Sequence, residues 1–233
     1  MKTPGVINQG AFSEVKNQIK SACKKSGRSI EDVQIIAVTK TFGIKAVESA
    51  LNASITCIGE NKVQEVELKV PQIQNRQNSE IHFIGHLQSN KVRKVLKYVD
   101  VIETVDSLKL AKRINSISHD LNIVSNIYIQ VNTGNDIAKY GFPVDEVINI
   151  ASQISQMNHL NLIGIMTIPP LNCSPTKLNN IFNKTRQIRD NIKNQVNPNC
   201  KELSMGMSGD FELAIENGAT HIRLGTILFG KRK

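Results

Sequence analysis

The chain has 233 residues, which at about 150 residues per domain allows one large domain or two small ones. Its 40% hydrophobic and 21% charged residues exclude a disordered tail or a fibrous repeat, and its longest apolar runs, residues 35–38 and 162–168, are far shorter than the ~18 residues of a membrane-spanning helix. The net charge of +9 favours anionic partners in general, whether phosphates, nucleic acid or acidic membranes.

Short apolar or alternating runs predict eight strands separated by polar stretches with helical periodicity. A helix over residues 12–25 is expected before the first strand and stops at Gly27. Two later helices are marked by a nearby proline, one over residues 144–154 after Pro143 and one over residues 178–192 after Pro175. The predicted strands are residues 33–38, 55–59, 81–84, 99–104, 127–131, 162–167, 203–205 and 221–224.

Strands that alternate with helices indicate βαβ units and a parallel sheet. Eight such units in roughly 200 residues fit a single closed (β/α)8 TIM-type barrel of minimal size, with an extra N-terminal helix. A doubly wound open sheet is the alternative, but it usually has a glycine-rich first turn, and here the first strand is followed by TKTFG over residues 39–43. Since no linker-like run divides the chain, we expect one domain over residues 1–233.

In a barrel, function gathers at the carboxyl ends of the strands. Lys40 directly follows the first strand, where a solvated surface lysine is the simplest interpretation. The alternative is a lysine shielded in the barrel mouth, where the charged form is disfavoured and a neutral amine can attack a carbonyl. Only the other strand ends can decide between these two interpretations.

The last two strand ends predict an anion site. Gly225 and Thr226 follow the eighth strand, and Ser208 follows the seventh; together they offer backbone N–H groups and two hydroxyls where barrels commonly bind phosphate. A packing glycine and an ordinary helix cap are the alternatives for Gly225 and Ser208. Arg223 lies two residues before Gly225 and therefore on the same face of the strand, where a cation needs a partner or a ligand.

Several sequence strings resemble one known family. AVTKTF, IGENKVQE, HFIGHLQSNKVRKV, TVDS, IQVNTGNDIAKYGF, GIMTIPP and LSMGMSGDFELAIENGATHIRLGTILFG occur in this order across residues 36–230. They are similar to the pyridoxal 5′-phosphate (PLP) homeostasis proteins, the YggS/PROSC family, whose fold is the alanine racemase N-terminal barrel. The resemblance covers nearly the whole chain.

The resemblance implies roles for individual residues. Lys40 would form the internal aldimine (a Schiff base) with PLP, and Asn61 would neighbour the cofactor at the end of the second strand. Arg223 corresponds to the racemase arginine that faces the pyridine nitrogen and keeps it unprotonated, which disfavours transamination. The phosphate would be held by Ser208, Gly225 and Thr226. Two further cofactor contacts are expected, a second or transient one at Lys139 and one at Met166, where the sixth strand ends.

Departures from the family and from the racemases bear on activity. Ile58 and Lys62 stand where family members often have an aromatic residue and a tyrosine, but both only flank Asn61. The chain ends three residues after Gly230, so we expect no racemase-type C-terminal domain and no tyrosine from it. Racemisation needs a proton donor on each face of the substrate, and only Lys40 is evident. Tyr140 is the one tyrosine that we place near the mouth. Efficient turnover is therefore not expected.

Two other kinds of site are set aside. His82 and His86 would lie about 13 Å apart on a strand and could not share a metal ion. Glu60 and Asp106 are expected to form structural pairs with nearby lysines. The basic segments at residues 90–94 and 231–233 indicate a solvated surface rather than a nucleic-acid site, because aromatic residues make up only 4% and none is interleaved with the basic residues.

The sequence thus predicts a PLP-binding protein that holds, buffers or delivers the cofactor, with apo PLP enzymes as partners and without nucleic acid or membrane. Four widely spaced cysteines without a CxxC pair, and a start that lacks a secretory signal, favour reduced thiols in a cytoplasmic protein. A monomer is expected. The alternatives are a weak PLP-dependent amino-acid racemase and a nucleic-acid-binding module.

Overall fold

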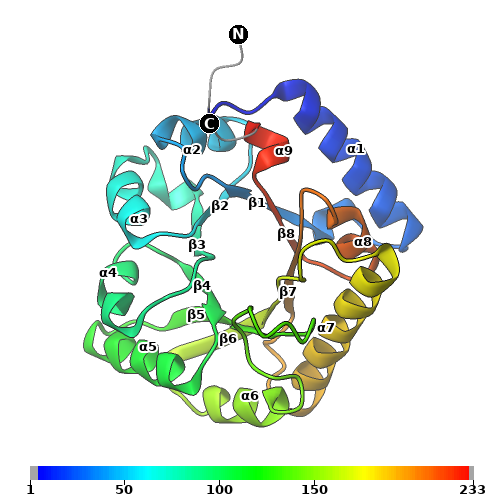
Figure 1. Ribbon diagram of the computed structural model, residues 1–233. Helices are drawn as coiled ribbons and strands as arrows, with labels where there is room; N and C mark the ends of the chain where they lie inside the picture. The colour runs from blue at the N-terminus through cyan, green and yellow to red at the C-terminus, as the bar shows by residue number, and fades with distance from the viewer. Residues whose placement is uncertain (1–4, 231–233) are drawn as a thin grey trace.

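The eight strands close into a ring of parallel β-structure (Figure 1). The computed structural model describes residues 5–230, in which each strand pairs with the next and β8 pairs with β1, Ile36 lying opposite Arg223. This confirms the predicted (β/α)8 barrel. The strands are β1 (Gln34–Val38), β2 (Cys57–Glu60), β3 (Glu80–Phe83), β4 (Val101–Val105), β5 (Ser125–Gln130), β6 (Leu160–Met166), β7 (Glu202–Met207) and β8 (His221–Leu224).

Helices surround the ring (Figure 1). Each of the longer ones turns an apolar stripe toward the strands, as α5 does with Leu110, Ile114 and Ile117. Short 3-10 turns over Ile30–Asp32, Val70–Gln72, Arg76–Asn78 and Ser89–Lys91 complete the connections. The α-helices of the described residues are α1 (Gln9–Lys25), α2 (Ile44–Asn52), α3 (Val63–Lys69), α4 (Val92–Val95), α5 (Leu108–Asp120), α6 (Val147–Ser155), α7 (Pro175–Gln195), α8 (Phe211–Glu216) and α9 (Thr226–Phe229).

Three helix starts differ from the prediction, and α1 begins at Gln9, three residues earlier than expected. The α7 helix begins three residues earlier than expected, because the Ser174 side chain accepts a hydrogen bond from Lys177 N and caps it, with Pro175 in the first turn. The α6 helix begins three residues later than expected. Phe142 still pairs with Gln130 and Asn132 of the β5 segment, which keeps the chain extended up to Pro143.

The extra helix α1 packs against the outside of the barrel beside α8 (Figure 1). Asn8 caps it by accepting a hydrogen bond from Ala11 N at 3.1 Å, and its buried face includes Phe12, Val15 and Ile19. After it ends, Arg28 donates hydrogen bonds to two backbone carbonyls near the end of α8. The helix is therefore fixed at both ends, and it covers one side of the barrel.

Two further expectations can be compared with the described residues. All four cysteines are free, with Cys23, Cys57 and Cys200 buried and Cys173 half-buried, as the sequence predicted. Within residues 5–230 there is no helix whose length and apolar character would allow it to cross a bilayer.

The barrel interior is divided between apolar and charged layers. Val101, Tyr128 and Met166 form a small apolar cluster inside the ring, separate from the larger core between strands and helices. Glu103 and Arg223 are also fully or almost fully buried inside the ring. Because a buried charge is costly unless it is paired, these two residues require partners within the barrel.

Candidate functional site

A cavity of about 280 Å³ opens at the carboxyl ends of the strands. This volume is just below the range for small-molecule sites, roughly 300–1,000 Å³. Five of the eight predicted cofactor residues line it: Lys40, Ser208, Arg223, Gly225 and Thr226. The structure therefore brings together side chains that lie up to 186 positions apart in the sequence, counted from Lys40 to Thr226.

Lys40 is half-buried in a tight turn that follows β1. Phe42 N donates to Thr39 O at 3.1 Å across the turn, and Thr41 has a positive φ of 69°. A β-branched residue in this region is strained and needs support from its surroundings. Glu65 gives that support, because its carboxylate accepts a hydrogen bond of 2.7 Å from Thr41 N.

Behind the turn lies a buried ion-pair network. Lys69 Nζ lies 2.7 Å from Oε1 of Glu60 and 2.7 Å from Oε2 of Glu65, and it donates to Thr39 O at 3.0 Å. Burial raises the pKa of Glu60, although hydrogen bonds from Lys69 and Thr39 act against this rise. Burial would also raise the pKa of Glu65, but the hydrogen bonds from Lys69 and Thr41 lower it. The network joins the end of β1 to α3, and it places Lys40 at the rim of the cavity.

The opposite side of the cavity offers hydrogen-bond donors. Ser208 and Gly209 come from the loop after β7, and Gly225 and Thr226 from the start of α9. Ile227 N donates to Ser208 Oγ at 3.4 Å, so the two loops are in contact. Hydroxyls and N–H groups at a helix start are the donor set that binds phosphate in proteins.

Arg223 is a buried cation in the cavity wall. Its Nη1 donates to Ser204 Oγ at 2.7 Å and its Nη2 to Thr167 O at 2.8 Å. Burial lowers the pKa of Arg223, and the charge of Glu103 acts in the opposite direction. Ser204 in turn donates to Glu103 Oε2 at 2.6 Å. The guanidinium is thus held in one orientation at the side of the cavity.

Asn61 lies at the end of β2, outside the residues that line the cavity. Its Oδ1 atom is buried and has no hydrogen-bond partner among the described residues. A side chain built on Gly85 would place its Cβ 2.1 Å from the Asn61 carbonyl oxygen, so the loop after β3 can pass this point only as glycine. An orphaned buried polar atom near the mouth is consistent with a polar ligand.

The other two predicted contacts lie away from the cavity. Lys139 is half-buried in the loop after β5, where its N–H donates to Asp136 O at 2.9 Å. Met166 is fully buried in the interior cluster with Val101 and Tyr128. The cavity wall nearby is formed by Ile168 instead. Contacts of the cofactor with Lys139 and Met166 remain predictions.

A second group of side chains lies at the mouth, on the loops after β3, β4 and β5. His86 Nδ1 is 3.0 Å from Asp106 Oδ2, and the His86 ring stacks on Tyr140 with centroids 4.0 Å apart. Asp106 therefore pairs with a histidine and not with a lysine as expected, because the loop after β3 brings His86 beside it. The expected lysine pairing holds for Glu60, through Lys69.

His82 and His86 have separate partners, as the strand spacing predicted. His82 is buried inside the barrel, where its Nδ1 lies 2.7 Å from Glu103 Oε1. Burial alone would lower the pKa of His82, but its interactions with Cys57, Glu103 and Glu80 outweigh this effect and raise the pKa well above its usual value. Burial would raise the pKa of Glu103. The hydrogen bond from His82 and the positive charges of His82 and Arg223 outweigh this effect and lower the pKa below its usual value.

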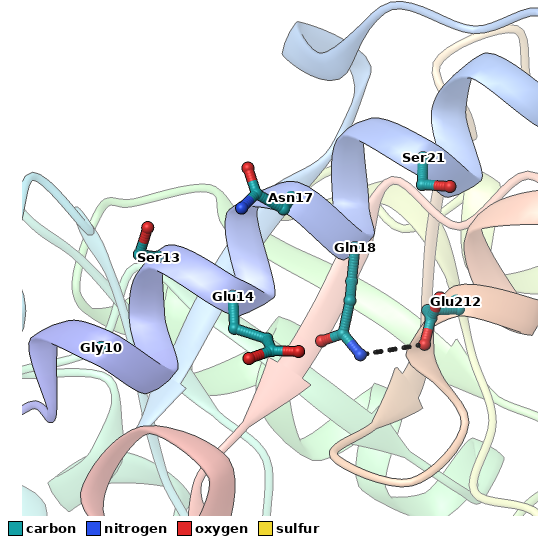
Figure 2. A pocket seen from close by; sticks show the side chains of 7 residues that line it. All are labelled: Gly10, Ser13, Glu14, Asn17, Gln18, Ser21 and Glu212. Carbon is teal, nitrogen blue, oxygen red and sulfur yellow. Dashed lines mark hydrogen bonds between the residues drawn. The ribbon is translucent and has the colours of Figure 1, made fainter.

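Another hollow, of about 500 Å³, lies on the outside of the barrel between α1 and α8 (Figure 2). Gln18 reaches across it and donates to Glu212 at 3.3 Å. Glu14 and Glu212 are its charged lining residues, so its charge is unsuited to a phosphate. The polar side chains in Figure 2 lie where α1 packs against α8. The cavity at the barrel mouth is therefore the better candidate for an anionic ligand.

Two of the three basic residues at positions 90–94 have acidic partners. Arg93 pairs with Asp120, and Lys94 lies 3.6 Å from Glu67. Acidic partners thus cover part of the segment at residues 90–94, which supports the interpretation as a solvated surface. The second basic segment, residues 231–233, lies outside the described residues.

Sequence reasoning missed two parts of the site. The apolar wall made by Val38, Ile84 and Ile168 was not predicted, because these residues are indistinguishable from core residues in the sequence. The link from Arg223 through Ser204 to Glu103 was also missed. Its one signal is a glutamate inside the otherwise uncharged strand VIETV, where a charged side chain must face a partner.

Fold and site together define a (β/α)8 barrel with a lysine after β1 and hydrogen-bond donors after β7 and β8. This is the class of the alanine racemase N-terminal domain, and the sequence profile described as "Alanine racemase, N-terminal domain" matches residues 12–233. A pyridoxal phosphate homeostasis protein from Aquifex aeolicus is 35% identical over 222 residues, covering 95% of this chain and 97% of the relative. One from Synechocystis is 40% identical over 200 residues, covering 86% and 92%. The chain therefore belongs to the pyridoxal phosphate homeostasis protein family.

Solved structures share the fold. A crystal structure of an unknown protein from Bifidobacterium adolescentis is 35% identical with a TM-score of 0.90, covering 94% of this chain and 92% of that one. PipY of Synechococcus elongatus, solved with PLP bound, is 33% identical with a TM-score of 0.81, covering 91% and 100%. An alanine racemase of Clostridium difficile is 18% identical with a TM-score of 0.76, and the likeness covers 97% of this chain and 61% of the racemase, which shows a shared fold.

Proposed function

We propose that this chain binds PLP at the carboxyl end of its barrel, through a covalent bond to Lys40, and takes part in holding and supplying the cofactor in the cytoplasm. The observation that carries the proposal is the cavity that gathers Lys40, Arg223 and the donors of Ser208, Gly225 and Thr226. The relatives named for PLP homeostasis, and PipY with PLP bound, support it. The four free cysteines agree with a reducing compartment.

The residues of the cavity suit the parts of the cofactor. Ser208 and the N–H groups at Gly225 and Thr226 would hold the phosphate, while the amine of Lys40 would hold the aldehyde carbon. Arg223 is proposed to keep the ring nitrogen unprotonated, since a fixed cation disfavours a second positive charge beside it. When bound, PLP supplies a reactive aldehyde and an electron-withdrawing ring. An anchored, covalently held aldehyde is kept from reacting with other amines in the cell.

Holding the cofactor, rather than turning over an amino acid, is the activity that the cavity supports best. Lys40 and Arg223 are the titratable side chains in its lining among the described residues. Racemisation requires a proton donor on each face of the substrate, and a buried, hydrogen-bonded guanidinium is a poor second acid. Delivery of PLP to apo PLP enzymes, and action as a monomer, belong to the same proposal.

The covalent bond is tested by borohydride reduction of the PLP-loaded protein followed by peptide mapping. We expect one reduced label, on the peptide that contains Lys40. Lys40→Ala should lose the label and keep the fold, because a half-buried residue at the mouth contributes little to the core. Lys94→Ala, at a lysine that pairs with Glu67 outside the cavity, is the control and should keep the label. A label on a different lysine, or one that persists in Lys40→Ala, would contradict the assignment.

Carrier and enzyme are distinguished by following amino-acid turnover with the same preparations. Exchange of the α-proton of alanine into deuterated water reports the first step that any racemase must perform. We expect the loaded protein to show a rate close to that of free PLP. A rate far above this level that disappears in Lys40→Ala would establish the weak racemase instead.

A further inference from the structure

Three potential metal ligands meet inside the barrel at its amino-terminal end, on the far side from Lys40. They are Cys57 at the start of β2, His82 on β3 and His221 at the start of β8. The thiol sulfur and one ring nitrogen of each histidine all lie within 4.8 Å of one another. Ligands at 2.0–2.3 Å from a tetrahedral zinc ion stand roughly 3.3–3.7 Å apart, so side-chain shifts of about 1 Å would close this set.

The ring of His82 is prepared for this role. Its Nδ1 is held by Glu103 Oε1 at 2.7 Å, while its Nε2 is buried and makes no hydrogen bond with any described residue. A carboxylate that fixes one ring nitrogen so that the other faces the ion is the usual outer partner of a metal-binding histidine. The side chain of His82 is only 1% exposed, so its orientation is set by the barrel and not by solvent.

His221 is fixed in a similar way. Its Nδ1 lies 3.0 Å from Thr220 Oγ1 and 3.3 Å from Tyr128 Oη. These contacts leave Nε2 as the ring nitrogen for a metal bond. The His82 and His221 rings lie with centroids 5.7 Å apart, which is consistent with two imidazoles that share a ligand.

Carboxylates supply a fourth position and an access route. Glu80 Oε2 lies 3.5 Å from His82 Nε2 and 3.8 Å from Cys57 Sγ. Glu202 Oε2 lies 3.6 Å from His221 Nδ1. The side chains of Glu80 and Glu202 are 44% and 34% exposed, so they reach from the buried cluster to solvent. Two anionic groups at the opening would attract a cation and guide it inward.

We propose that Cys57, His82 and His221 form a zinc-class metal site that closes the amino-terminal end of the barrel, with Glu80 as the fourth ligand. On binding, the thiol proton of Cys57 and the proton on His82 Nε2 leave to solvent, and the sulfur and two ring nitrogens donate lone pairs to the ion. Sulfur and imidazole donors in a four-coordinate arrangement are typical of Zn²⁺. Since the ligands come from β2, β3 and β8, the ion would join strands on both sides of β1 and stabilise the barrel.

The site is tested on the full chain without a histidine tag, freed of metal by chelation and titrated with Co²⁺ as a spectroscopic probe. We expect one Co²⁺ per chain, a thiolate-to-cobalt absorption band, displacement by Zn²⁺ and a higher melting temperature with either ion. Cys57→Ser should lose the band and bind Co²⁺ more than about ten-fold more weakly, the scale of effect that even outer partners have.

Two control variants separate the site from other metal binding. Cys200→Ser removes a buried thiol elsewhere and should keep the band and the affinity. His159→Asn breaks up another histidine pair, His119 and His159, whose rings are 4.9 Å apart on the surface, and it should also change nothing. X-ray absorption of the wild-type zinc form should show one sulfur and at least two nitrogen neighbours.

That X-ray measurement keeps the test decisive if Cys57→Ser does not fold. The proposal is overturned if the folded chain binds no Co²⁺, if bound cobalt gives no thiolate band, or if Cys57→Ser binds as tightly as the wild type. Each of these outcomes would leave His82 as a member of a metal-free ion-pair network with Glu80 and Glu103. None of the outcomes depends on PLP binding at the other end of the barrel.

Discussion

Arg223 and Glu103, on β8 and β4, hold the same hydroxyl group inside the barrel. The guanidinium donates to Ser204 Oγ at 2.7 Å, and this hydroxyl donates to the carboxylate at 2.6 Å. Glu103 also bonds to His82, so a continuous chain of hydrogen bonds runs from the cavity wall to the centre of the barrel. Charges of opposite sign are thereby paired through the Ser204 hydroxyl without direct contact. The orientation of Arg223 in the cavity wall is therefore fixed by residues on other strands.

Removing the shared hydroxyl should destabilise the barrel. In Ser204→Ala, Glu103 loses a donor and Arg223 an acceptor, and both groups stay buried. Unsatisfied buried groups of this kind cost about 1–3 kcal/mol, and more where they are charged. We expect the free energy of unfolding, measured in urea, to fall by at least this amount. PLP affinity should fall as well, because Arg223 can then move.

Ser125→Ala is the matched control for Ser204→Ala. It breaks a buried bond of 2.7 Å between two neutral hydroxyls, Ser118 and Ser125, far from the charged chain. The expected loss is smaller, about 0.5–1.5 kcal/mol. If Ser204→Ala and Ser125→Ala lower the free energy of unfolding equally, the burial of Arg223 and Glu103 does not depend on their hydrogen bonds to Ser204.

The lysine behind the Lys40 turn is a positioning residue. Lys69→Met keeps the length of the side chain but leaves Glu60 buried beside Thr39 without its cation. Breaking a buried ion pair on one side costs about 3–5 kcal/mol. We expect this loss in urea unfolding and less borohydride-trapped PLP on Lys40, at a temperature where the protein is folded.

Two further variants show whether the buried charge causes the loss. Adding Glu60→Gln to Lys69→Met removes the unpaired carboxylate and should restore part of the stability. Lys94→Met breaks an exposed pair with Glu67 and should cost less than about 1 kcal/mol. If Lys69→Met and Lys94→Met lower the free energy of unfolding equally, the buried Lys69 network stabilises the protein no more than an exposed ion pair does.

The fold could be predicted because each βα unit shows its pattern locally. The strand at residues 221–224 was predicted with the bounds that the structure gives it, since it is a short run of alternating polar and apolar residues. The late start of α6, by contrast, arises from a contact between separate segments, the pairing of Phe142 with β5. Local sequence patterns do not contain such contacts.

The site was predictable where residues end a strand and not where they lie within one. Lys40, Ser208 and Gly225 stand at positions where a barrel must open, so their place followed from the strand assignments. Glu103 and Ser204 lie inside strands, and their meeting depends on how the ring closes. The closure of the ring, and with it the metal-ligand cluster at Cys57, is a property of the whole barrel.

Gly206 should be intolerant of substitution because of its backbone conformation. Its φ is +92°, and an added Cβ would lie 2.6 Å from Ala214 Cβ and 3.0 Å from Phe211 Cα. The conformation alone costs a non-glycine residue about 1–3 kcal/mol. We expect Gly206→Ala to lower the free energy of unfolding by more than this and to weaken PLP binding, because the Ser208 loop follows directly.

Gly209, three residues further along the chain in the loop after β7, is the matched control. An added Cβ there would meet nothing within 4 Å. Gly209→Ala should therefore change the free energy of unfolding by no more than about 0.5 kcal/mol. If Gly206→Ala and Gly209→Ala lower the free energy of unfolding equally, the backbone conformation at Gly206 is not the cause of the loss.

Cys200 should make the protein less stable in alkali. Its side chain is fully buried, and this burial raises the pKa of its thiol to about 12. In the unfolded chain a cysteine ionises near pH 8.5, so above this pH deprotonation favours the unfolded state. The stability associated with the neutral thiol is complete below about pH 8.5 and is lost as the pH rises toward 12, at up to about 1.4 kcal/mol per pH unit.

Urea unfolding of Cys200→Ala should show a shallower decline of the free energy of unfolding over this pH range than the wild type. Iodoacetamide should label half-buried Cys173 well before Cys200 in the folded protein. Parallel declines, or early labelling of Cys200, would show that its thiol is accessible to water.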